Sequence, residues 1–376
     1  MIDMKVPYFE PNISENDKKS VLRALNQRWL TNGKYLKKFE NNFHNFIDSK
    51  YAIGVGSATH ALHLSLRAMN VGIGDEVIVP TFTFAATANA VSYCGATPIL
   101  TDVDIDTFNI SSKEIQKKIN KNTKGIVVVH YGGQACDMDE ILSVAKKNNL
   151  FVIEDCAHAL GSTYKNKKCG NIGKTGCFSF YPTKIITTAE GGMITTNHSI
   201  INNKVNLLKS QGMNISAKDR EKKLQWKYDL VELGYNYRLD EMRSALGWSQ
   251  LKRVNEFNKK RILIAKKYDE KLKKIKGITI PQKKSDRNHI YHLYTIKIEK
   301  DFHFSRNELF DHFSNNQIGT SIQYFPLHLM SLYKEKYSKK IKNFTNSNKL
   351  KDQVISLPIF PSMTTKQIEY VISTLM

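Results

Sequence analysis

Two side chains in the first half of the sequence could together carry out chemistry on a small molecule. Asp155 follows the apolar run 151–153 and is expected at the carboxyl end of a strand, where ligands gather in parallel sheets. Lys184 lies in the stretch 177–193, whose only other charged residue is Glu190. A partly desolvated lysine has a lowered pKa and can form a Schiff base with an aldehyde. Considered singly, Asp155 could equally cap a helix or form an ion pair, and Lys184 could be a solvated surface residue.

Glu154 and Asp155 are adjacent, so in a strand they point to opposite faces and only one is expected to face a site. Small polar residues at 56–59 join a strand to a helix, where free N–H groups and the helix dipole suit a phosphate. Phe82 and Phe84 are two residues apart at the end of the next strand, so their side chains are expected on the same face, where a ring could face a flat cofactor. Phe82 is expected in the core.

A phosphate cradle, an aromatic ring, a buried aspartate and a reactive lysine are what pyridoxal phosphate (PLP) requires. The aspartate keeps the pyridine nitrogen protonated, and the lysine forms the Schiff base and then moves a proton. No metal-ligand spacing is completed around His60 and His63, which are expected to be packed or surface histidines. The five cysteines form no CxxC pair and are odd in number, which argues against a zinc site or a disulfide framework and favours a cytoplasmic location.

The elements that position these residues alternate between strand and helix, which predicts an α/β fold with a mostly parallel sheet covered on both faces. The expected strands are 51–55, 76–79, 97–101, 125–129, 151–154, 177–180 and 192–195. The expected helices between them are 58–69, 84–93, 112–120 and 138–148, after entry helices at 14–28 and 35–47 with Ser14 as N-cap. After long helices over 239–274, a strand at 291–298 and helices at 306–315 and 365–375 predict a smaller α+β domain.

We therefore expect a large PLP-binding domain over 14–250 and a small C-terminal domain over 251–376, with residues 1–13 as an N-terminal extension. The formal net charge is +21, from 46 Lys and 10 Arg against 35 acidic residues. Such a charge raises nucleic acid or an anionic membrane as a partner. No nucleic-acid-binding motif, secretory signal or long apolar run is visible, so a solvated lysine-rich surface is the preferred interpretation and a basic regulatory protein the non-enzyme alternative.

Several motifs in order give the sequence a resemblance to the DegT-type nucleotide-sugar aminotransferases, which belong to the aspartate-aminotransferase-like fold type I PLP enzymes. The resemblance runs over nearly the whole chain. The motifs are WLTNGKYLKKFE, GSATHALHLSL, GDEVIVPTFTFAATANAV, VVVHYGGQACDMDEI, IEDCAHALGSTYK, FSFYPTKIITTAEGGMITT, ELGYNYRLDEMRSALGWSQL, SIQYFPLH and LPIFPSMT.

The resemblance implies a role for each matching position. Lys184 corresponds to the Schiff-base lysine, Asp155 to the partner of the pyridine nitrogen, and Phe84 to the aromatic residue stacked on the cofactor. The remaining implied positions are His158 near the phenolic oxygen, Ser57, Ala58 and Ser179 at the phosphate, Asn236 reaching the phosphate of a partner subunit in a homodimer, and Arg238, Tyr324 and His328 near the sugar nucleotide.

The implied reaction transfers an amino group from L-glutamate to a keto-sugar linked to a nucleoside diphosphate. The motifs most resemble the pseudaminic-acid-pathway branch, which acts at C-4 of UDP-linked 4-keto-6-deoxy-N-acetyl sugars in glycan biosynthesis. A C-3 aminotransferase, a perosamine-type GDP-sugar 4-aminotransferase, a sugar dehydratase and an amino-acid aminotransferase remain alternatives. Tyr181 and Ala189 depart from the family pattern, which often has histidine and glycine there.

Overall fold

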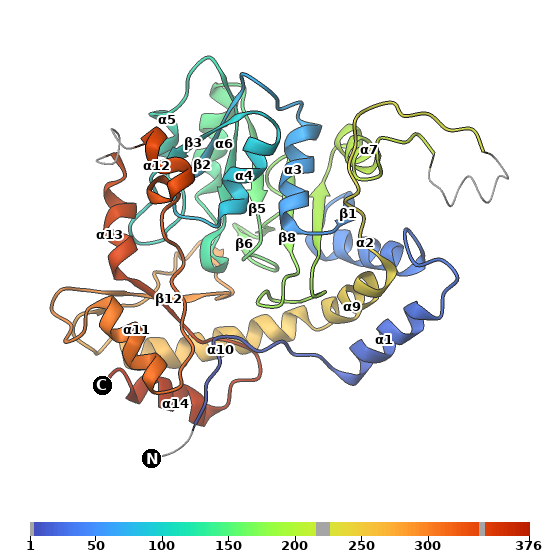
Figure 1. The fold of residues 1–376 in the computed structure, drawn as a ribbon. Helices are drawn as coiled ribbons and strands as arrows, with labels where there is room; N and C mark the ends of the chain where they lie inside the picture. The colour runs from blue at the N-terminus through green and yellow to red at the C-terminus, as the bar shows by residue number, and fades with distance from the viewer. Residues whose placement is uncertain (1–3, 216–225, 338–342) are drawn as a thin grey trace.

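The computed structural model describes residues 4–215, 226–337 and 343–376. At its centre is a seven-stranded sheet with the strand order β1-β9-β8-β5-β4-β2-β3 (Figure 1). Every neighbouring pair is parallel except the two pairs that β9 forms with β1 and β8. The strands are β1 (Tyr51–Val55), β2 (Glu76–Pro80), β3 (Thr97–Thr101), β4 (Thr123–Val129), β5 (Phe151–Asp155), β8 (Thr175–Ser179) and β9 (Gly192–Thr196). The predicted mostly parallel sheet is confirmed.

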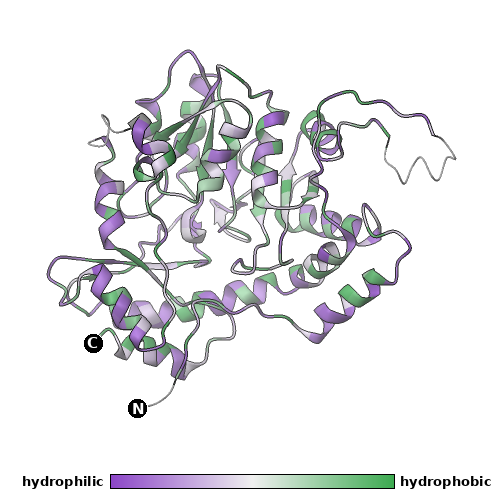
Figure 2. Cartoon of the chain, viewed as in Figure 1, coloured by the Kyte–Doolittle hydropathy of each residue, from purple (hydrophilic) through white to green (hydrophobic). Residues whose placement is uncertain are grey.

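The neighbouring strands β4 and β5 show why helices cover both faces of this sheet. Val128 and Val152 pack into one apolar cluster, whereas Val127 and Ile153 belong to the cluster on the opposite face. Consecutive apolar residues, which point to opposite faces of a strand, are typical of parallel strands buried on both sides. Figure 2 shows the hydrophobic interior around the sheet. The first face is covered by α2 (Lys34–Ile47), α5 (Ser112–Gln116) and α6 (Met138–Lys147), and the second by α3 (Ala58–Ala68), α4 (Ala85–Tyr93) and α7 (Ser199–Leu208).

The entry helix α1 (Glu15–Leu25) begins where the sequence predicts. The Ser14 hydroxyl accepts from the N–H of Asp17 at 3.2 Å, and the Asp17 carboxylate accepts from the N–H of Ser14 at 2.8 Å. This capping box satisfies two backbone donors at the helix start. The helix packs against α9 (Glu241–Leu251), where the Ser20 hydroxyl donates to the carbonyl of Ala245.

A second, smaller core forms around the three-stranded antiparallel sheet β10-β12-β13. The long helix α10 (Val254–Leu272) joins the two cores, because Phe257 packs in the large core and Tyr268 in the small one. Val6 lies in the small core and pairs with Ile318, so the N-terminal extension packs with the small unit. The other elements of this part are β10 (Ile278–Thr279), β12 (Tyr294–Ile298), β13 (Val354–Leu357), α11 (Arg306–Asn315), α12 (Ser331–Tyr337), α13 (Thr345–Gln353) and α14 (Thr365–Ser373).

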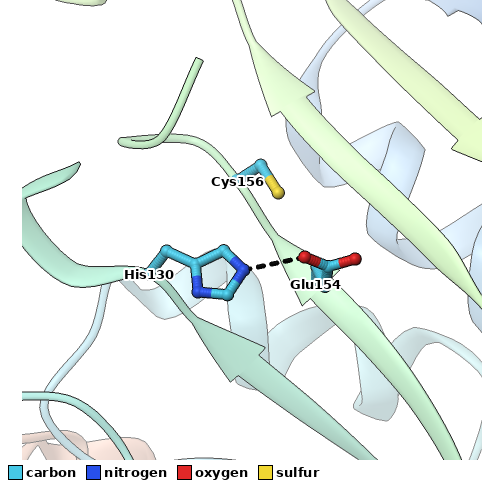
Figure 3. Close-up of side chains that lie close together, drawn as sticks. All are labelled: His130, Glu154 and Cys156. Atoms are coloured by element: carbon cyan, nitrogen blue, oxygen red, sulfur yellow. Dashed lines mark hydrogen bonds and ion pairs between the residues drawn. The ribbon is translucent and has the colours of Figure 1, made fainter. Parts of the chain in front are cut away.

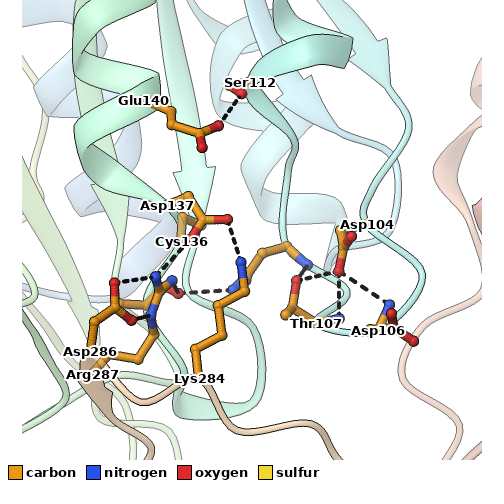
Figure 4. A network of polar contacts seen from close by, with 12 residues as sticks. Asp104, Asp106, Thr107, Ser112, Cys136, Asp137, Glu140, Lys284, Asp286 and Arg287 are labelled. Carbon is orange, nitrogen blue, oxygen red and sulfur yellow. Dashed lines mark hydrogen bonds and ion pairs between the residues drawn. The ribbon is translucent and has the colours of Figure 1, made fainter.

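A polar network ties the segment before β12 to the large unit (Figure 4). Strand β11 (Arg287–Asn288) pairs with β6 (Thr163–Tyr164), which forms a hairpin with β7 (Lys167–Lys168). The buried guanidinium of Arg287 donates to Asp137 at 2.6 Å, to Asp286 and to the carbonyl of Ala135 at 2.7 Å. Lys284 donates to the same Asp137 carboxylate at 2.7 Å. These bonds fix residues 284–288 against the loop that follows β4.

Two stretches on either side of residues 216–225 run together as an arm that projects from the large unit (Figure 1). Met213 pairs with Leu230, and the N–H of Val231 donates to the carbonyl of Gly212 at 3.0 Å. Large apolar side chains on the arm are exposed, including Trp226 at 86% and Leu233 at 80%. Among the described residues, no helix is both long enough and apolar enough to span a bilayer.

Candidate active site

Asp155 ends β5 on the face covered by α3 and α4, and its carboxylate is buried. Its Oδ2 accepts from the Thr87 hydroxyl at 3.0 Å and its Oδ1 from the N–H of Ala157 at 3.1 Å. Burial raises the pKa of Asp155, and these two hydrogen bonds and the charge of Lys184 oppose the rise without cancelling it. Among the described residues, no basic side chain forms an ion pair with Asp155. The carboxylate is thus suited to a cationic ligand.

Thr87 was not singled out by the sequence, although TFAATANAV placed small polar residues at the start of α4. Its hydroxyl proton goes to Asp155, so the Thr83 hydroxyl donates to Thr87 across 2.9 Å. The two threonines therefore orient the carboxylate from the side of α4.

Lys184 lies in the tight loop between β8 and β9. The loop closes through the bond from the N–H of Thr188 to the carbonyl of Phe180, and Ile185 and Ile186 anchor it in the large core. Burial lowers the pKa of Lys184 to about 8, and the charge of Asp155 counteracts part of this shift. At pH 7 about one amine in ten is then neutral, compared with roughly one in several thousand at an ordinary lysine pKa. A neutral amine is the nucleophile that Schiff-base chemistry needs.

His158 is buried beside these two residues and contacts Tyr324 from the small unit. The N–H of Gly132 donates to His158 Nδ1 at 3.4 Å, and Nε2 lies 3.0 Å from the Tyr324 hydroxyl. Because Nδ1 accepts, the neutral ring carries its proton on Nε2 and donates it to the Tyr324 oxygen. Burial and the charge of Lys184 hold the pKa of His158 well below its usual value. The predicted residues His158 and Tyr324 are therefore brought together.

The three predicted phosphate residues meet at the N-terminus of α3. Ser57 is the N-cap, and its hydroxyl accepts from the N–H of His60 at 3.1 Å. Gly192 of β9 lies flush against this helix start, since a Cβ there would be 2.5 Å from the Ser57 carbonyl and 2.8 Å from the nitrogen of Ala58. Ser179 pairs directly with Gly192 across the β8–β9 ladder. The first-turn N–H groups of a helix have no intrahelical acceptor, so this corner suits an anion.

Phe82 and Phe84 lie in different surroundings, as the sequence predicts: the first is buried and the second is exposed. Phe82 is buried in a cluster with Tyr131 and Phe108. Phe84 precedes α4, is 62% exposed, and its ring centroid lies 6.3 Å from that of Tyr324. An exposed ring at the end of β2 is available to a flat ligand.

Asn236 and Arg238 lie on a segment that runs beside the end of β1. The N–H of Gly56 donates to the carbonyl of Tyr237 at 2.9 Å, and Arg238 pairs with Val55. Tyr237 stacks on His60 at 3.7 Å, so His60 is a packed residue, and His63 is buried nearby. The side chain of Asn236 is exposed, and its contact with a partner subunit stays a prediction.

His328 does not join the site in this structure. The ring is fully buried and stacks on Phe344 at 4.0 Å. Nδ1 lies 2.8 Å from the Thr81 hydroxyl and Nε2 lies 3.1 Å from Asn348 Oδ1. With both nitrogens occupied, His328 anchors the segment that carries Tyr324 to the end of β2, and any direct contact with a sugar nucleotide stays a prediction.

On the other face of β5, Glu154 forms a closed cluster with His130 and Cys156 (Figure 3). Glu154 accepts from His130 Nε2 at 2.9 Å and from the N–H groups of Gly170, Ile172 and Gly173 at 2.6–2.8 Å. His130 Nδ1 accepts from the N–H of Cys136, so both ring nitrogens are used. Burial raises the pKa of the Cys156 thiol well above its usual value, which disfavours the thiolate that a metal would need. Hydrogen bonds account for the positions of Glu154 and His130 in this cluster.

Comparisons with known proteins identify the family of the chain. Residues 11–376 match the DegT/DnrJ/EryC1/StrS aminotransferase family. GDP-perosamine synthase of Escherichia coli O157:H7 is 37% identical over 367 residues, which cover 97% of this chain and 96% of that protein. The structure of Helicobacter pylori PseC, an aminotransferase involved in the biosynthesis of pseudoaminic acid, superposes with a TM-score of 0.91 at 31% identity, covering 99% of this chain and 98% of that one. The PLP form of Spr1654 from Streptococcus pneumoniae superposes with a TM-score of 0.92 at 28% identity and covers 99% and 98%.

The chain belongs to the DegT/DnrJ/EryC1/StrS aminotransferase family. It is a PLP-dependent sugar aminotransferase with the fold type I architecture, which confirms the family, fold and cofactor predicted from the sequence. Three features of the site suit PLP: a buried carboxylate that no described cation pairs with, an amine of lowered pKa, and a helix N-terminus set against small residues.

Proposed function

We propose that the protein transfers the amino group of L-glutamate to the C-4 ketone of a nucleotide-linked 4-keto-6-deoxyhexose, of the UDP-N-acetyl type, in the synthesis of a surface glycan. The observation that carries the proposal is that Lys184 and Asp155 lie close enough for the charge of each to shift the pKa of the other, although no described cation forms an ion pair with Asp155. The motifs TFAATANA, HALGSTYK and VELGYNYRL support the substrate class, as does the structural likeness to PseC.

Each residue of the site has a proposed task. Bound PLP supplies an electron sink for the carbon that gains or loses the amine. Lys184 holds the cofactor and moves the proton at that carbon. Asp155 keeps the ring nitrogen protonated, and Phe84 covers the ring. His158 lies beside the phenolic oxygen, and Ser57, Ala58 and Ser179 hold the phosphate.

The substrate side is proposed to involve Arg238 and Tyr324. Arg238 stands beside the helix start that takes the cofactor phosphate, where its guanidinium can pair with a second anion such as a sugar diphosphate. Tyr324 reaches His158 from the small unit, so a sugar bound between the two units would contact its ring. His328 supports this segment from the core.

We also propose a homodimer with shared active sites. Trp226, Leu230 and Leu233 on the projecting arm are 63–86% exposed, and a second copy would bury them. Asn236 lies at the base of this arm and is proposed to reach the partner's cofactor phosphate. Light scattering of the purified protein should give twice the chain mass, and a monomer at micromolar concentration would contradict this.

A cytoplasmic location is proposed from the cysteines. All five are buried and free of disulfides, which suits a reducing compartment.

A panel of keto-sugars tests the substrate. The purified enzyme is incubated with L-glutamate and, in separate reactions, a UDP-linked 4-keto-6-deoxy-N-acetylhexose, a GDP-linked 4-keto-6-deoxyhexose and a C-3 keto-sugar, and the amino product is identified by NMR. We expect the UDP sugar to react fastest, with the new amine at C-4. A faster reaction with the GDP sugar would move the assignment to a perosamine-type enzyme, which the identity with GDP-perosamine synthase favours as the second candidate. Amination at C-3 only would overturn both.

A further inference from the structure

A second imidazole, that of His292, lies beside His158, and none of the roles proposed for the site involves it. His292 is 4% exposed, and its ring centroid lies 4.5 Å from that of His158 at an interplanar angle of 38°. Its Nδ1 is buried and has no hydrogen-bond partner among the residues that the structure describes. A buried polar atom without a partner costs the fold about 1–3 kcal/mol, so an apolar ring of the same size would be more stable here.

The backbone holds His292 and His158 in one rigid unit. Gly132 donates its N–H to His158 Nδ1 and accepts at its carbonyl from the N–H of Leu293 at 3.2 Å. The N–H of Ile290 donates to the carbonyl of Gly133 at 3.1 Å. A Cβ at Gly133 would lie 3.0 Å from the His158 carbonyl oxygen and 3.2 Å from the nitrogen of His292, and its φ of +96° also favours glycine. The two histidines therefore have fixed positions relative to each other.

His292 also borders both chain segments that bring reactive groups to the site. A small pocket of about 10 Å³ is lined by His292 together with Thr183, which precedes Lys184, and Gln323, which precedes Tyr324. The titratable groups that face His292 are His158 after β5, Lys184 in the β8–β9 loop, Arg261 of α10 and Tyr8 of the N-terminal segment. Burial, together with the neighbouring His158 and the charges of Lys184 and Arg261, holds the pKa of His292 well below its usual value, so the ring is a neutral dipole.

We propose that His292 is a positioning residue of the active site. Its ring packs against His158 and makes the buried surroundings of His158 and Lys184 more polar. This polarity lowers the stability of the fold. The proposal rests on the proposed function in one respect, since it assumes that Lys184 carries the cofactor. His292 acts through its neighbours and is given no contact with the reacting atoms.

The test compares apolar and polar replacements of His292. His292→Phe keeps an aromatic ring against His158 and removes the unpaired nitrogen, so the cofactor-free protein should melt about 2 °C or more above wild type. In the loaded enzyme a less polar site disfavours a protonated nitrogen on Lys184. The pH midpoint of the visible absorbance band should therefore fall by about 0.5 unit or more, a threefold change in the protonation constant.

A second pair of variants separates polarity from shape. His292→Asn and His292→Leu differ little in shape, so the polar Asn should keep the midpoint near wild type and the apolar Leu should lower it. This pair answers the question even if His292→Phe does not fold. An unchanged midpoint in the apolar variants, or an equal shift in Asn and Leu, would overturn the proposal.

His289 offers a matched control three residues away. It is as buried as His292, but its Nδ1 accepts from the N–H of Tyr291 at 3.0 Å and its ring stacks on Tyr291 at 4.0 Å. His289→Phe should lower the melting temperature and leave the absorbance midpoint unchanged, which is the opposite pattern to His292→Phe. If the midpoint shifted as far in His289→Phe, any loss of a buried histidine would have this effect, and the proposal would be contradicted. A wild-type enzyme that shows no visible band after loading with PLP would instead contradict the role of Lys184.

Discussion

Glu154 and Asp155 are consecutive carboxylates on one strand, both buried, yet their surroundings differ completely. Glu154 faces the α6 side of the sheet and accepts four hydrogen bonds, one from His130 (Figure 3) and three from backbone N–H groups. Asp155 faces the α4 side and accepts two, and no described cation pairs with it. A buried group whose bonding capacity is filled stabilises the fold, whereas one left partly unfilled at a strand end is available to a ligand.

The same contrast extends to the groups around each carboxylate. In the Glu154 cluster, the carboxylate and both ring nitrogens of His130 already have hydrogen-bond partners, so the cluster does not call for an ion. The Asp155 side gathers a lysine of lowered pKa, a neutral histidine and a helix N-terminus from separate segments of the chain. The predictions below alter one side at a time.

Removing the amine on the Asp155 side should have the largest effect. Lys184→Ala should lose the visible absorbance band and at least about 10⁴-fold in turnover, because the Schiff base is formed by the amine that this substitution removes. The measurement is an absorbance spectrum with a glutamate-dependent assay. Lys168→Ala is the control, since burial also lowers the pKa of Lys168, whose ammonium lies 4.1 Å from the Phe46 ring centroid. Full turnover in Lys184→Ala would contradict the site.

Asp155→Asn should lower turnover by about 10²-fold or more, because a neutral amide does not hold a protonated ring nitrogen. The cofactor-free variant should be as stable as wild type or more so, since it removes a buried carboxylate that forms no ion pair within the described part of the chain. Urea unfolding and steady-state kinetics measure the two effects. Nearly normal turnover would place the charge partner of the cofactor elsewhere.

Glu154→Gln should show the reverse pattern. Its amide NH₂ would face N–H donors that now find a carboxylate oxygen, so we expect a loss of about 3 kcal/mol in unfolding free energy. Turnover per folded molecule should change by less than about threefold. If turnover instead fell as far as in Asp155→Asn with stability unchanged, the contrast between the two carboxylates would be wrong.

The pKa of Lys184 makes stability on the Asp155 side depend on pH. The unfolded chain keeps the lysine proton up to about pH 10.5 and the folded chain only up to about pH 8, so wild-type stability should rise with pH between these values. Cofactor-free Lys184→Met should therefore exceed wild type by about 3 kcal/mol near pH 7, a difference that shrinks between pH 8 and 10.5. Unfolding curves at several pH values measure it; a difference independent of pH would contradict the lowered pKa.

Asp137→Asn should have the smallest effect, about 1 kcal/mol in stability, because the half-exposed carboxylate leaves Arg287 with its other acceptors (Figure 4). Burial tends to raise the pKa of Asp137, but the bonds from Lys284 and Arg287 outweigh it and lower the pKa. The contribution should therefore be present near neutral pH and lost as the pH falls below the usual range of an aspartate. Turnover should not change, and a large loss would show that this network reaches the site.

The sequence predicted the sheet because its strands are short apolar runs between helical stretches, and it predicted Lys184 because that lysine has so few charged neighbours. Strand alternation alone could not decide which of Glu154 and Asp155 faces the ligand, because it does not say on which face the other site residues lie, and it was the family resemblance that assigned Asp155. The expected strand from Tyr291 begins at Tyr294 instead. Tyr291 has a φ of +52°, and the N–H groups of Ile290 and Leu293 bond to the glycine loop rather than to a strand.

That loop is also why His292 was not found. Its place beside His158 depends on Gly132 and Gly133, which are about 160 residues away in the sequence and take positive φ angles. Nothing in the local pattern HIYHLY distinguishes His292 from His289.

The central claim is that one of the 46 lysines carries the cofactor, and it can be tested on the unaltered enzyme. The protein is loaded with PLP, reduced with borohydride to make the linkage permanent, digested, and analysed by mass spectrometry. We predict that the cofactor adduct is found on Lys184. An adduct on a different lysine, or on none, would contradict the account.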